Sequence, residues 1–207
     1  MGFEIVENYY RQAHFDFFRS YRNPFYAITF ELDATAVKAF CQNSSWPVYR
    51  NLCYFFARAM QPVEDFRYRV RDDRIVLYDT LEVAATLPAP DRMFSFGYLG
   101  YHPDAAEFNR HAEELDRSRR AAVSLEQPED TNQILFSAIP GVRFTGLTHA
   151  TPDDTLDGRP RVAFGRFFER SGRLMVPVGL EVNHIFVDGA AIGKLVEEVQ
   201  REYDRPH

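Results

Sequence analysis

The stretch from Leu180 to Lys194 constrains the fold more than any other part of the chain. An apolar run that carries His184 ends at Asp188-Gly189, and from residue 190 to about 203 the apolar positions recur at helical spacing. This pattern predicts a strand, a tight turn and an amphipathic helix. The imidazole of His184 would then lie at the carboxyl end of the strand, where a general base can face a cleft. A structural histidine before an ordinary Asp-Gly turn fits the same residues, so both interpretations stay open here.

Strand and helix patterns alternate irregularly along the rest of the chain. Helices are expected over residues 33–41, 47–60 and 105–122, and strands over residues 25–32, 66–71, 75–78, 82–87, 93–99, 133–138, 141–148, 161–169 and 174–185. Asp33 is expected to cap the first helix, and Asp72-Asp73 to turn a hairpin. The irregular succession favours an α/β fold, a two-layer sandwich with a mixed β-sheet and helices packed on it, over a doubly wound parallel sheet. With no internal repeat or linker, residues 1–207 are expected to form a single domain.

Charge and apolar patterning argue against several classes of partner. The net charge is −6 and no long basic run is present, so nucleic acid is not an expected partner. No run approaches the roughly 20 apolar residues of a membrane span, and the first residues lack the basic region of a signal peptide. We therefore expect a cytoplasmic protein that has no membrane partner.

The cysteine, histidine and aromatic residues indicate which kinds of functional site the chain can form. Cys41 and Cys53 lie in apolar helical patterns, which predicts buried free thiols. The chain lacks Cys-x-x-Cys and His-Glu-x-x-His patterns, so no metal site is expected. The 19 Phe and 11 Tyr residues are an unusually large share, and they can fill a core, a subunit interface or an apolar pocket.

Four segments of the chain carry family-like motifs: Arg11–Phe15, Phe66–Asp79, Ile134–Thr145 and Val176–Gly189, the last of which ends in His-x-x-x-Asp-Gly. In this order they resemble the chloramphenicol acetyltransferase family of CoA-dependent acyltransferases, whose core motif is His-x-x-x-Asp-Gly. Each segment alone is a weak signal, but four of them in order are specific. The resemblance implies the α/β sandwich of that family. It also implies an O-acyltransferase that moves an acetyl group from acetyl-CoA, its cosubstrate, to a hydroxyl of chloramphenicol or a related small molecule.

The resemblance assigns catalytic roles to two residues. His184 would act as the general base on the acceptor hydroxyl. Ser137 would donate a hydrogen bond to the oxyanion of the tetrahedral intermediate, in a direct transfer without a covalent acyl-enzyme. The residues around Ser137 alone favour an ordinary buried hydroxyl, and they lack the Gly-x-Ser-x-Gly pattern of a nucleophile.

The carboxylate of Asp188 has two possible roles. It could be the orienting acid of a catalytic triad. The resemblance implies instead that Asp188 pairs with Arg11, and that this pair, with Gly189, supports the turn that presents His184. Removing one partner of such a buried pair would cost about 3–5 kcal/mol.

The acceptor pocket is implied by the resemblance alone. Its candidate residues are Phe17, Phe18, Tyr26, Phe94, Phe96, Phe144, Leu147 and His149. Core packing is the alternative for each of the aromatic residues, and we expect it to hold for at least half of them.

Several positions depart from the family pattern. Asn183 stands where many members have a second histidine, Gly141 replaces a tryptophan, and Ala163 replaces a threonine that holds a water near the oxyanion. The segment 121–125 lacks aromatic residues that help to wall the chloramphenicol pocket in resistance enzymes. These departures predict an intact base and an altered acceptor pocket.

The resemblance also implies a homotrimer in which His184 of one chain faces Ser137 of its neighbour. Its role would be antibiotic resistance if chloramphenicol is the acceptor, or biosynthesis if another alcohol is. A non-catalytic homologue that binds a small ligand, or that only assembles, is the alternative from a different class. The presence of His184, Asp188, Arg11 and Ser137 argues against it, because an inactive relative tends to lose its base first.

Overall fold

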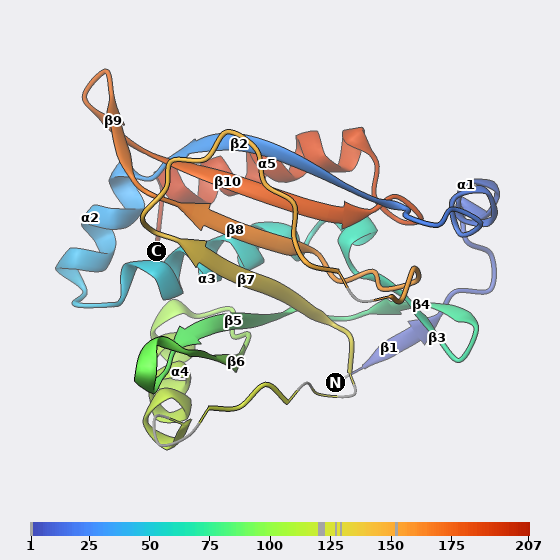
Figure 1. Cartoon of the computed structure of the whole chain (residues 1–207), viewed down its shortest axis with the longest axis horizontal. Helices are drawn as coiled ribbons and strands as arrows, with labels where there is room; N and C mark the ends of the chain where they lie inside the picture. Colours follow the sequence, from blue (N-terminus) through green and yellow to red (C-terminus); the bar gives the residue numbers. More distant parts are fainter. Residues whose placement is uncertain (1, 120–122, 127, 129, 152) are drawn as a thin grey trace.

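One large mixed sheet forms the centre of the computed structural model, which describes residues 2–119, 123–126, 128, 130–151 and 153–207 (Figure 1). In spatial order its strands are β2 (Phe25–Asp33), β10 (Arg173–Asn183), β8 (Arg161–Gly165), β7 (Gln133–Ile139), β5 (Glu82–Pro88) and β6 (Phe94–Gly100), and β9 (Phe168–Arg170) pairs with β10. The pairs β5–β7 and β7–β8 are parallel, and the other pairs are antiparallel. The predicted mixed sheet is therefore confirmed.

A smaller antiparallel sheet consists of β1 (Phe3–Ile5), β4 (Arg74–Tyr78) and β3 (Tyr68–Arg71). Its hairpin turns at Asp72 and Asp73, whose φ angles of 50° and 57° lie in the left-handed region. Two consecutive left-handed residues match the twist of a two-residue hairpin, and aspartate tolerates that region better than most residues. The predicted hairpin is confirmed.

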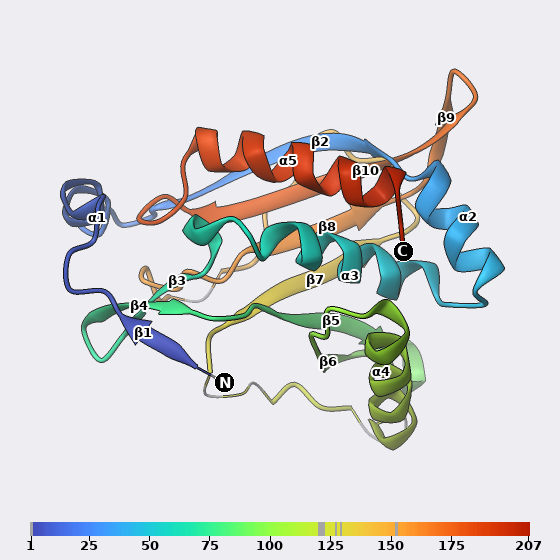
Figure 2. The same cartoon turned by 180° about the vertical axis from the view of Figure 1, so that it is seen from behind.

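Helices cover one face of the large sheet (Figure 2). They are α2 (Thr35–Asn43), α3 (Val48–Met60), α4 (Ala105–Arg119) and α5 (Gly189–Asp204). Helix α1 (Gln12–Phe18) lies beyond one end of the sheet, and short 3-10 turns occur at Glu64–Phe66 and Pro90–Arg92. Helices α3 and α5 pack side by side across the sheet, whereas α4 packs on β6. The core lies between this helix layer and the sheet. It contains Phe55 and Phe56 of α3, Leu195 of α5, and the alternate strand residues Val162 and Leu180.

The face of the sheet away from the helices is crossed by the segment that follows β7 (Figure 1). Glycines allow this close approach. A Cβ atom on Gly165 would lie 2.8 Å from the carbonyl oxygen of Val142 and 2.9 Å from Cε1 of Phe144, and one on Gly179 would lie 2.9 Å from Cδ2 of Leu147. Small residues on this face thus leave room for the crossing segment.

The prediction of a strand over residues 141–148 is wrong. This segment pairs with no strand and instead lies on the sheet, with Phe144 against Gly165 and Leu147 against Gly179. The alternation of its apolar residues reflects packing onto a sheet face, which produces a pattern similar to that of a half-buried strand.

Two other boundaries differ from expectation. Asp33 ends β2, and its Oδ1 accepts from the backbone nitrogen of Thr35 at 2.9 Å, but the residue at the N-cap position of α2 is Ala34. The strand expected over 161–169 is divided into β8 and β9, because the backbone nitrogen of Arg166 donates to the carbonyl of Val142 instead of a neighbouring strand. The end of the helix expected over 105–122 lies outside the described residues beyond Arg119.

Both cysteines, Cys41 and Cys53, are buried and free, as predicted. Among the described residues, no helix is both long enough and apolar enough to cross a membrane. The same residues contain no group of three or more His, Cys, Asp or Glu side chains arranged to hold a metal ion.

Candidate active site

His184 lies in a tight turn directly after β10. The carbonyl of Asn183 accepts from the backbone nitrogens of Phe186 and Val187, at 3.2 and 3.1 Å. The Nδ1 atom of His184 is 2.9 Å from the carbonyl oxygen of Val187. Because a carbonyl can only accept, Nδ1 carries the hydrogen and Nε2 keeps its lone pair in the neutral ring. The turn therefore selects the tautomer in which Nε2 is the basic atom.

Two aromatic side chains fix the plane of this imidazole. Phe18 stacks on it with a centroid separation of 4.2 Å and an interplanar angle of 22°, and Tyr26 lies at 4.8 Å. The Tyr26 hydroxyl also donates to the carbonyl of Val187 at 3.4 Å. Burial raises the pKa of this phenol to about 12, so it stays uncharged. The side chain of Phe17 packs on Phe18 and is more than half exposed.

Arg11 holds the turn from the outside. Its guanidinium donates to the carbonyl of Phe186 at 2.8 Å and lies 3.5 Å from Oδ2 of Asp188. The other oxygen of Asp188 accepts from the backbone nitrogens of Ala190 and Ala191 and so caps α5. The N–H of Ala191, with the charge of Arg11, holds the pKa of the Asp188 carboxyl below its usual range.

The expected contact between Arg11 and Asp188 is present, but the carboxylate is 41% exposed, so the pair is only partly buried. Asp188 does not orient the imidazole directly, since Nδ1 of His184 is bound to a carbonyl. Gly189 opens α5, and a Cβ atom there would meet no atom within 4 Å. No steric reason for a glycine at this position exists within the described part of the chain.

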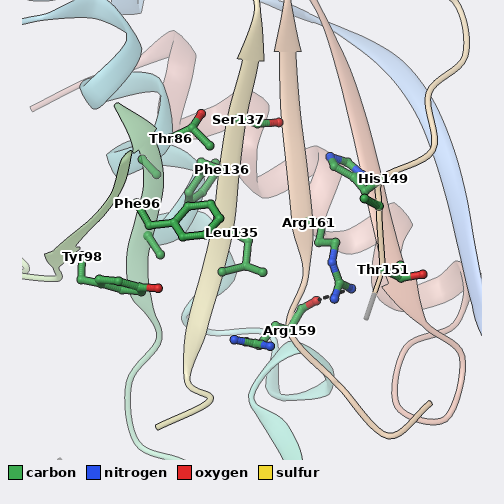
Figure 3. A pocket seen from close by; sticks show the side chains of 13 residues that line it. Thr86, Phe96, Tyr98, Leu135, Phe136, Ser137, His149, Thr151, Arg159 and Arg161 are labelled. Carbon is green, nitrogen blue, oxygen red and sulfur yellow. Dashed lines mark hydrogen bonds between the residues drawn. The ribbon is translucent and has the colours of Figure 1, made fainter. Parts of the chain in front are cut away.

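Ser137 lies in a cavity of about 440 Å³ on the other half of the sheet (Figure 3). The cavity is lined by Ala84, Ala85, Thr86, Phe96, Tyr98, Leu135, Phe136, Ser137, His149, Ala150, Thr151, Arg159 and Arg161. Strands β5, β6, β7 and β8 supply most of these residues, and the crossing segment supplies His149, Ala150 and Thr151. The base and the oxyanion donor expected from the sequence thus belong to two separate groups of side chains.

The candidate acceptor residues divide between these two groups. Phe18 and Tyr26 contact His184, with Phe17 beside them. Phe96 and His149 line the cavity of Ser137. Of the other candidates, Phe94 packs on Phe96 at 5.7 Å, whereas Phe144 and Leu147 pack on sheet glycines.

Ser137 and His184 lie far apart within one chain. Ser137 is in register with Ala163 of β8, and Ala163 is in register with Gly179 of β10. His184 follows Gly179 by five residues. At about 3.3 Å per residue and about 4.8 Å between strands, His184 lies about 16 Å further along the sheet and about 10 Å across it. One chain therefore does not bring the two side chains to a common reacting atom.

The residues that depart from the family pattern lie in different surroundings. The side-chain amide of Asn183 donates to the carbonyl of Thr155 at 2.8 Å, which ties the loop before β8 to the His184 turn. Ala163 lies beside Ser137 in the sheet, and Gly141 faces open space. Of the segment 121–125, residues 121 and 122 lie outside the described part.

Sequence reasoning missed several polar residues near the cavity, including Thr86, Tyr98, Arg159 and Arg161. It also missed Glu181, which is 4% exposed and accepts from the backbone nitrogen of His149 at 3.1 Å. The sequence feature that could have identified Glu181 is its position as a single carboxylate inside the otherwise apolar run of β10. A charge in such a run is costly unless it has a partner or a function.

Comparison with known proteins finds relatives that match this chain over most of its length. A family model described as "Chloramphenicol acetyltransferase" matches residues 1–200. The chloramphenicol acetyltransferase of Bacillus pumilus is 26% identical over 94% of this chain and 90% of its own length, and that of Streptomyces acrimycini is 28% identical over the same shares. A solved chloramphenicol acetyltransferase structure is similar with a TM-score of 0.87 and 26% identity, over 97% of this chain and 99% of that chain. These matches confirm the predicted fold class and the predicted class of enzyme. The chain belongs to the chloramphenicol acetyltransferase family.

Proposed function

We propose that this protein is a CoA-dependent O-acyltransferase that moves an acetyl group from acetyl-CoA to a hydroxyl of a small acceptor. Chloramphenicol is the first acceptor to test, because the relatives carry its name. The observation that carries the proposal is the tautomer of His184, whose Nδ1 is bound to a carbonyl while Nε2 keeps its lone pair. A basic nitrogen presented in this way is what removal of a hydroxyl proton requires.

His184 acts at both ends of the reaction. Its Nε2 takes the proton of the acceptor hydroxyl as that oxygen attacks the thioester carbonyl. The hydroxyl of Ser137 donates to the oxyanion that forms, a contact worth about 3–4 kcal/mol in comparable sites. His184 then returns the proton to the departing thiolate, and the acceptor oxygen has replaced sulfur on the acyl carbon. The carbonyl of Val187 holds Nδ1 throughout, so the ring keeps its orientation.

The site is completed between chains of a homotrimer. The separation of Ser137 and His184 within one chain supports this arrangement, since a neighbouring chain has to supply the missing partner. In a cyclic trimer, each interface joins one surface of a chain to a different surface of its neighbour. His184 of one copy can therefore face the Ser137 cavity of the next. Three equivalent sites result.

The test is acetyl-CoA turnover, followed by thiol release, with chloramphenicol and a panel of alcohols. Wild-type protein and His111→Ala, a control at an exposed histidine of α4, should turn over equally, whereas His184→Ala and Ser137→Ala should be severely impaired. Chains of these two variants, unfolded and reassembled together, should recover activity that neither has alone. No turnover of any alcohol by the wild type would refute the function. A monomer by light scattering, or no recovery in proven mixed assemblies, would refute the shared site.

A further inference from the structure

The side chain of Asn183 joins the His184 turn to the loop that precedes β8. Its Nδ2 donates to the carbonyl of Thr155 at 2.8 Å and to the carbonyl of Asp157 at 3.2 Å. Its Oδ1 accepts from the backbone nitrogen of Ile185 at 3.1 Å. Because Asn183 is only 1% exposed, these hydrogen bonds are shielded from water. The amide is therefore fully used, and it lies between two segments that are distant in the sequence.

The loop is held firmly on the other side of this amide. The carboxylate of Asp157 is 2% exposed, accepts from the backbone nitrogen of Arg159 at 3.0 Å and pairs with the guanidinium of Arg161 at 2.6 Å. The loop also contacts the turn at a second point, since a Cβ atom on Gly158 would lie 3.0 Å from the ring of Phe186. A loop that is fixed in these ways can serve as a reference for the position of the turn.

The turn passes this anchorage on to the imidazole of the base. The backbone carbonyl of Asn183 accepts from the backbone nitrogen of Val187, and the carbonyl of Val187 holds Nδ1 of His184. Without the Asn183 amide, two loop carbonyls would lose this donor, and unpaired carbonyls away from water are costly. The loop and the turn would then have to move apart, and the carbonyl of Val187 would move with the turn.

An asparagine suits these neighbours better than the histidine that many members of the family carry. A carboxamide offers two donors and an acceptor at once, which matches two carbonyls and one backbone N–H. A neutral imidazole offers one donor and one acceptor, so it can satisfy at most two of these groups. The departure at position 183 is thus matched by the loop around Thr155 and Asp157 in this chain.

We propose that Asn183 is a positioning residue for the transfer reaction. It fixes the Val187 carbonyl, and through that carbonyl the ring of His184, against the loop of residues 154–160. This inference rests on the proposed function, because it takes His184 as the base. The amide acts only through the turn. A looser turn weakens the hold on Nδ1 and lets the hydrogen move to Nε2, and a ring with its hydrogen there cannot take the acceptor's proton at that atom.

The test compares Asn183→Ser with the wild type. Serine can still accept from the backbone nitrogen of Ile185 in the same kind of turn, but its side chain is too short to reach the loop carbonyls. Asn51→Ser is the matched control. Asn51 is 0% exposed, and its amide bonds the carbonyl of Pro47 and both polar side-chain atoms of Asn109, none of which belongs to the turn or to the loop.

Two measurements are made on each variant that folds by circular dichroism. One gives kcat and KM for acetyl-CoA and for the acceptor that the wild type uses best. The other is the proton–nitrogen correlation spectrum of the isotope-labelled histidine rings, which shows which ring nitrogen carries the hydrogen; the signal of His184 is the one missing from His184→Ala. Asn183→Ser should lower kcat by about 10- to 100-fold with little change in either KM, and its His184 should show a mixture of tautomers. Wild type and Asn51→Ser should have equal kcat and the Nδ1–H tautomer alone.

Wild-type kcat together with a single tautomer in Asn183→Ser would overturn the inference, and so would an equal loss of kcat in Asn51→Ser. A lower kcat with the tautomer unchanged would also overturn it, because Asn183 would then act elsewhere. Should Asn183→Ser fail to fold, Asn183→Thr repeats the test, since threonine has nearly the volume of asparagine and the same hydroxyl. If the wild type acylates no alcohol, the proposed function fails, but the tautomer of His184 in the variant still decides whether Asn183 holds the turn.

Discussion

Replacing Arg11 with methionine tests how the His184 turn is held in place. Methionine keeps much of the length of the side chain but removes its charge and its donors. The guanidinium donates to the carbonyl of the buried Phe186 at 2.8 Å, and loss of a charged donor to such a group costs about 1.5–3 kcal/mol. The contact with Asp188 is 3.5 Å long and its carboxylate is 41% exposed, so solvent screening limits it to about 0.5–1 kcal/mol. Arg11→Met should therefore lower the free energy of unfolding by about 2–4 kcal/mol.

A double-mutant cycle separates the contribution of Asp188 from those of the Phe186 carbonyl and of Asp65, whose Oδ1 lies 3.4 Å from the Arg11 guanidinium. Asp188→Asn removes the charge but keeps an oxygen that can cap α5, so it should cost only about 0.5–1 kcal/mol. The coupling between Arg11→Met and Asp188→Asn should be of the same size, well below the 3–5 kcal/mol expected for a fully buried pair. Most of the destabilisation by Arg11→Met should be the same whether residue 188 is Asp or Asn, because it comes from the lost contacts with the Phe186 carbonyl and Asp65.

The assay is urea denaturation at one fixed protein concentration, since the proposed homotrimer would make the apparent stability depend on concentration. The pKa of Asp188 is lowered in the folded chain, so its contribution is fully present above the ordinary value of 3.8 and disappears as pH falls through the lower folded value. The effect of Asp188→Asn should accordingly be constant from pH 5 to 8 and shrink below about pH 3.8. An Arg11→Met variant that loses less than about 1 kcal/mol, or a cycle with no coupling, would refute this account.

Three further perturbations have defined outcomes. His184→Ala should lower kcat by several orders of magnitude with assembly intact, because the base and the acid for the leaving group are lost together; more than a tenth of wild-type turnover would contradict its role. Ser137→Ala should lower kcat by about 10²-fold with little change in KM, and an effect confined to KM would make Ser137 a ground-state contact instead. Gly165→Ala should lower the free energy of unfolding by about 1–3 kcal/mol in urea, since its Cβ would approach the carbonyl of Val142 and the ring of Phe144, both in the crossing segment, within 3 Å; an unchanged midpoint would show that the crossing segment lies elsewhere.

Local patterns in the sequence were enough to predict most helices and strands. The alternation of Phe25 to Leu32 and the helical spacing after residue 190 agree with β2 and α5 to within a residue or two at each end. They could be predicted because periods of 2 and 3.6 residues record which side of an element faces the core. The segment 141–148 could not, because packing on top of a sheet and pairing beside a strand bury alternate residues in the same way.

In the candidate site, too, some features follow from neighbouring residues in the sequence and others from contacts between distant segments. The sequence by itself determined that a histidine lies at the carboxyl end of an apolar strand and precedes a helix with an aspartate at its start. Only the tertiary structure decided that Nδ1 of His184 meets the carbonyl of Val187, that Arg11 anchors the turn, and that Ser137 lies on a distant part of the sheet. Strand register and backbone carbonyl positions depend on residues far apart in the chain, and no local periodicity encodes them.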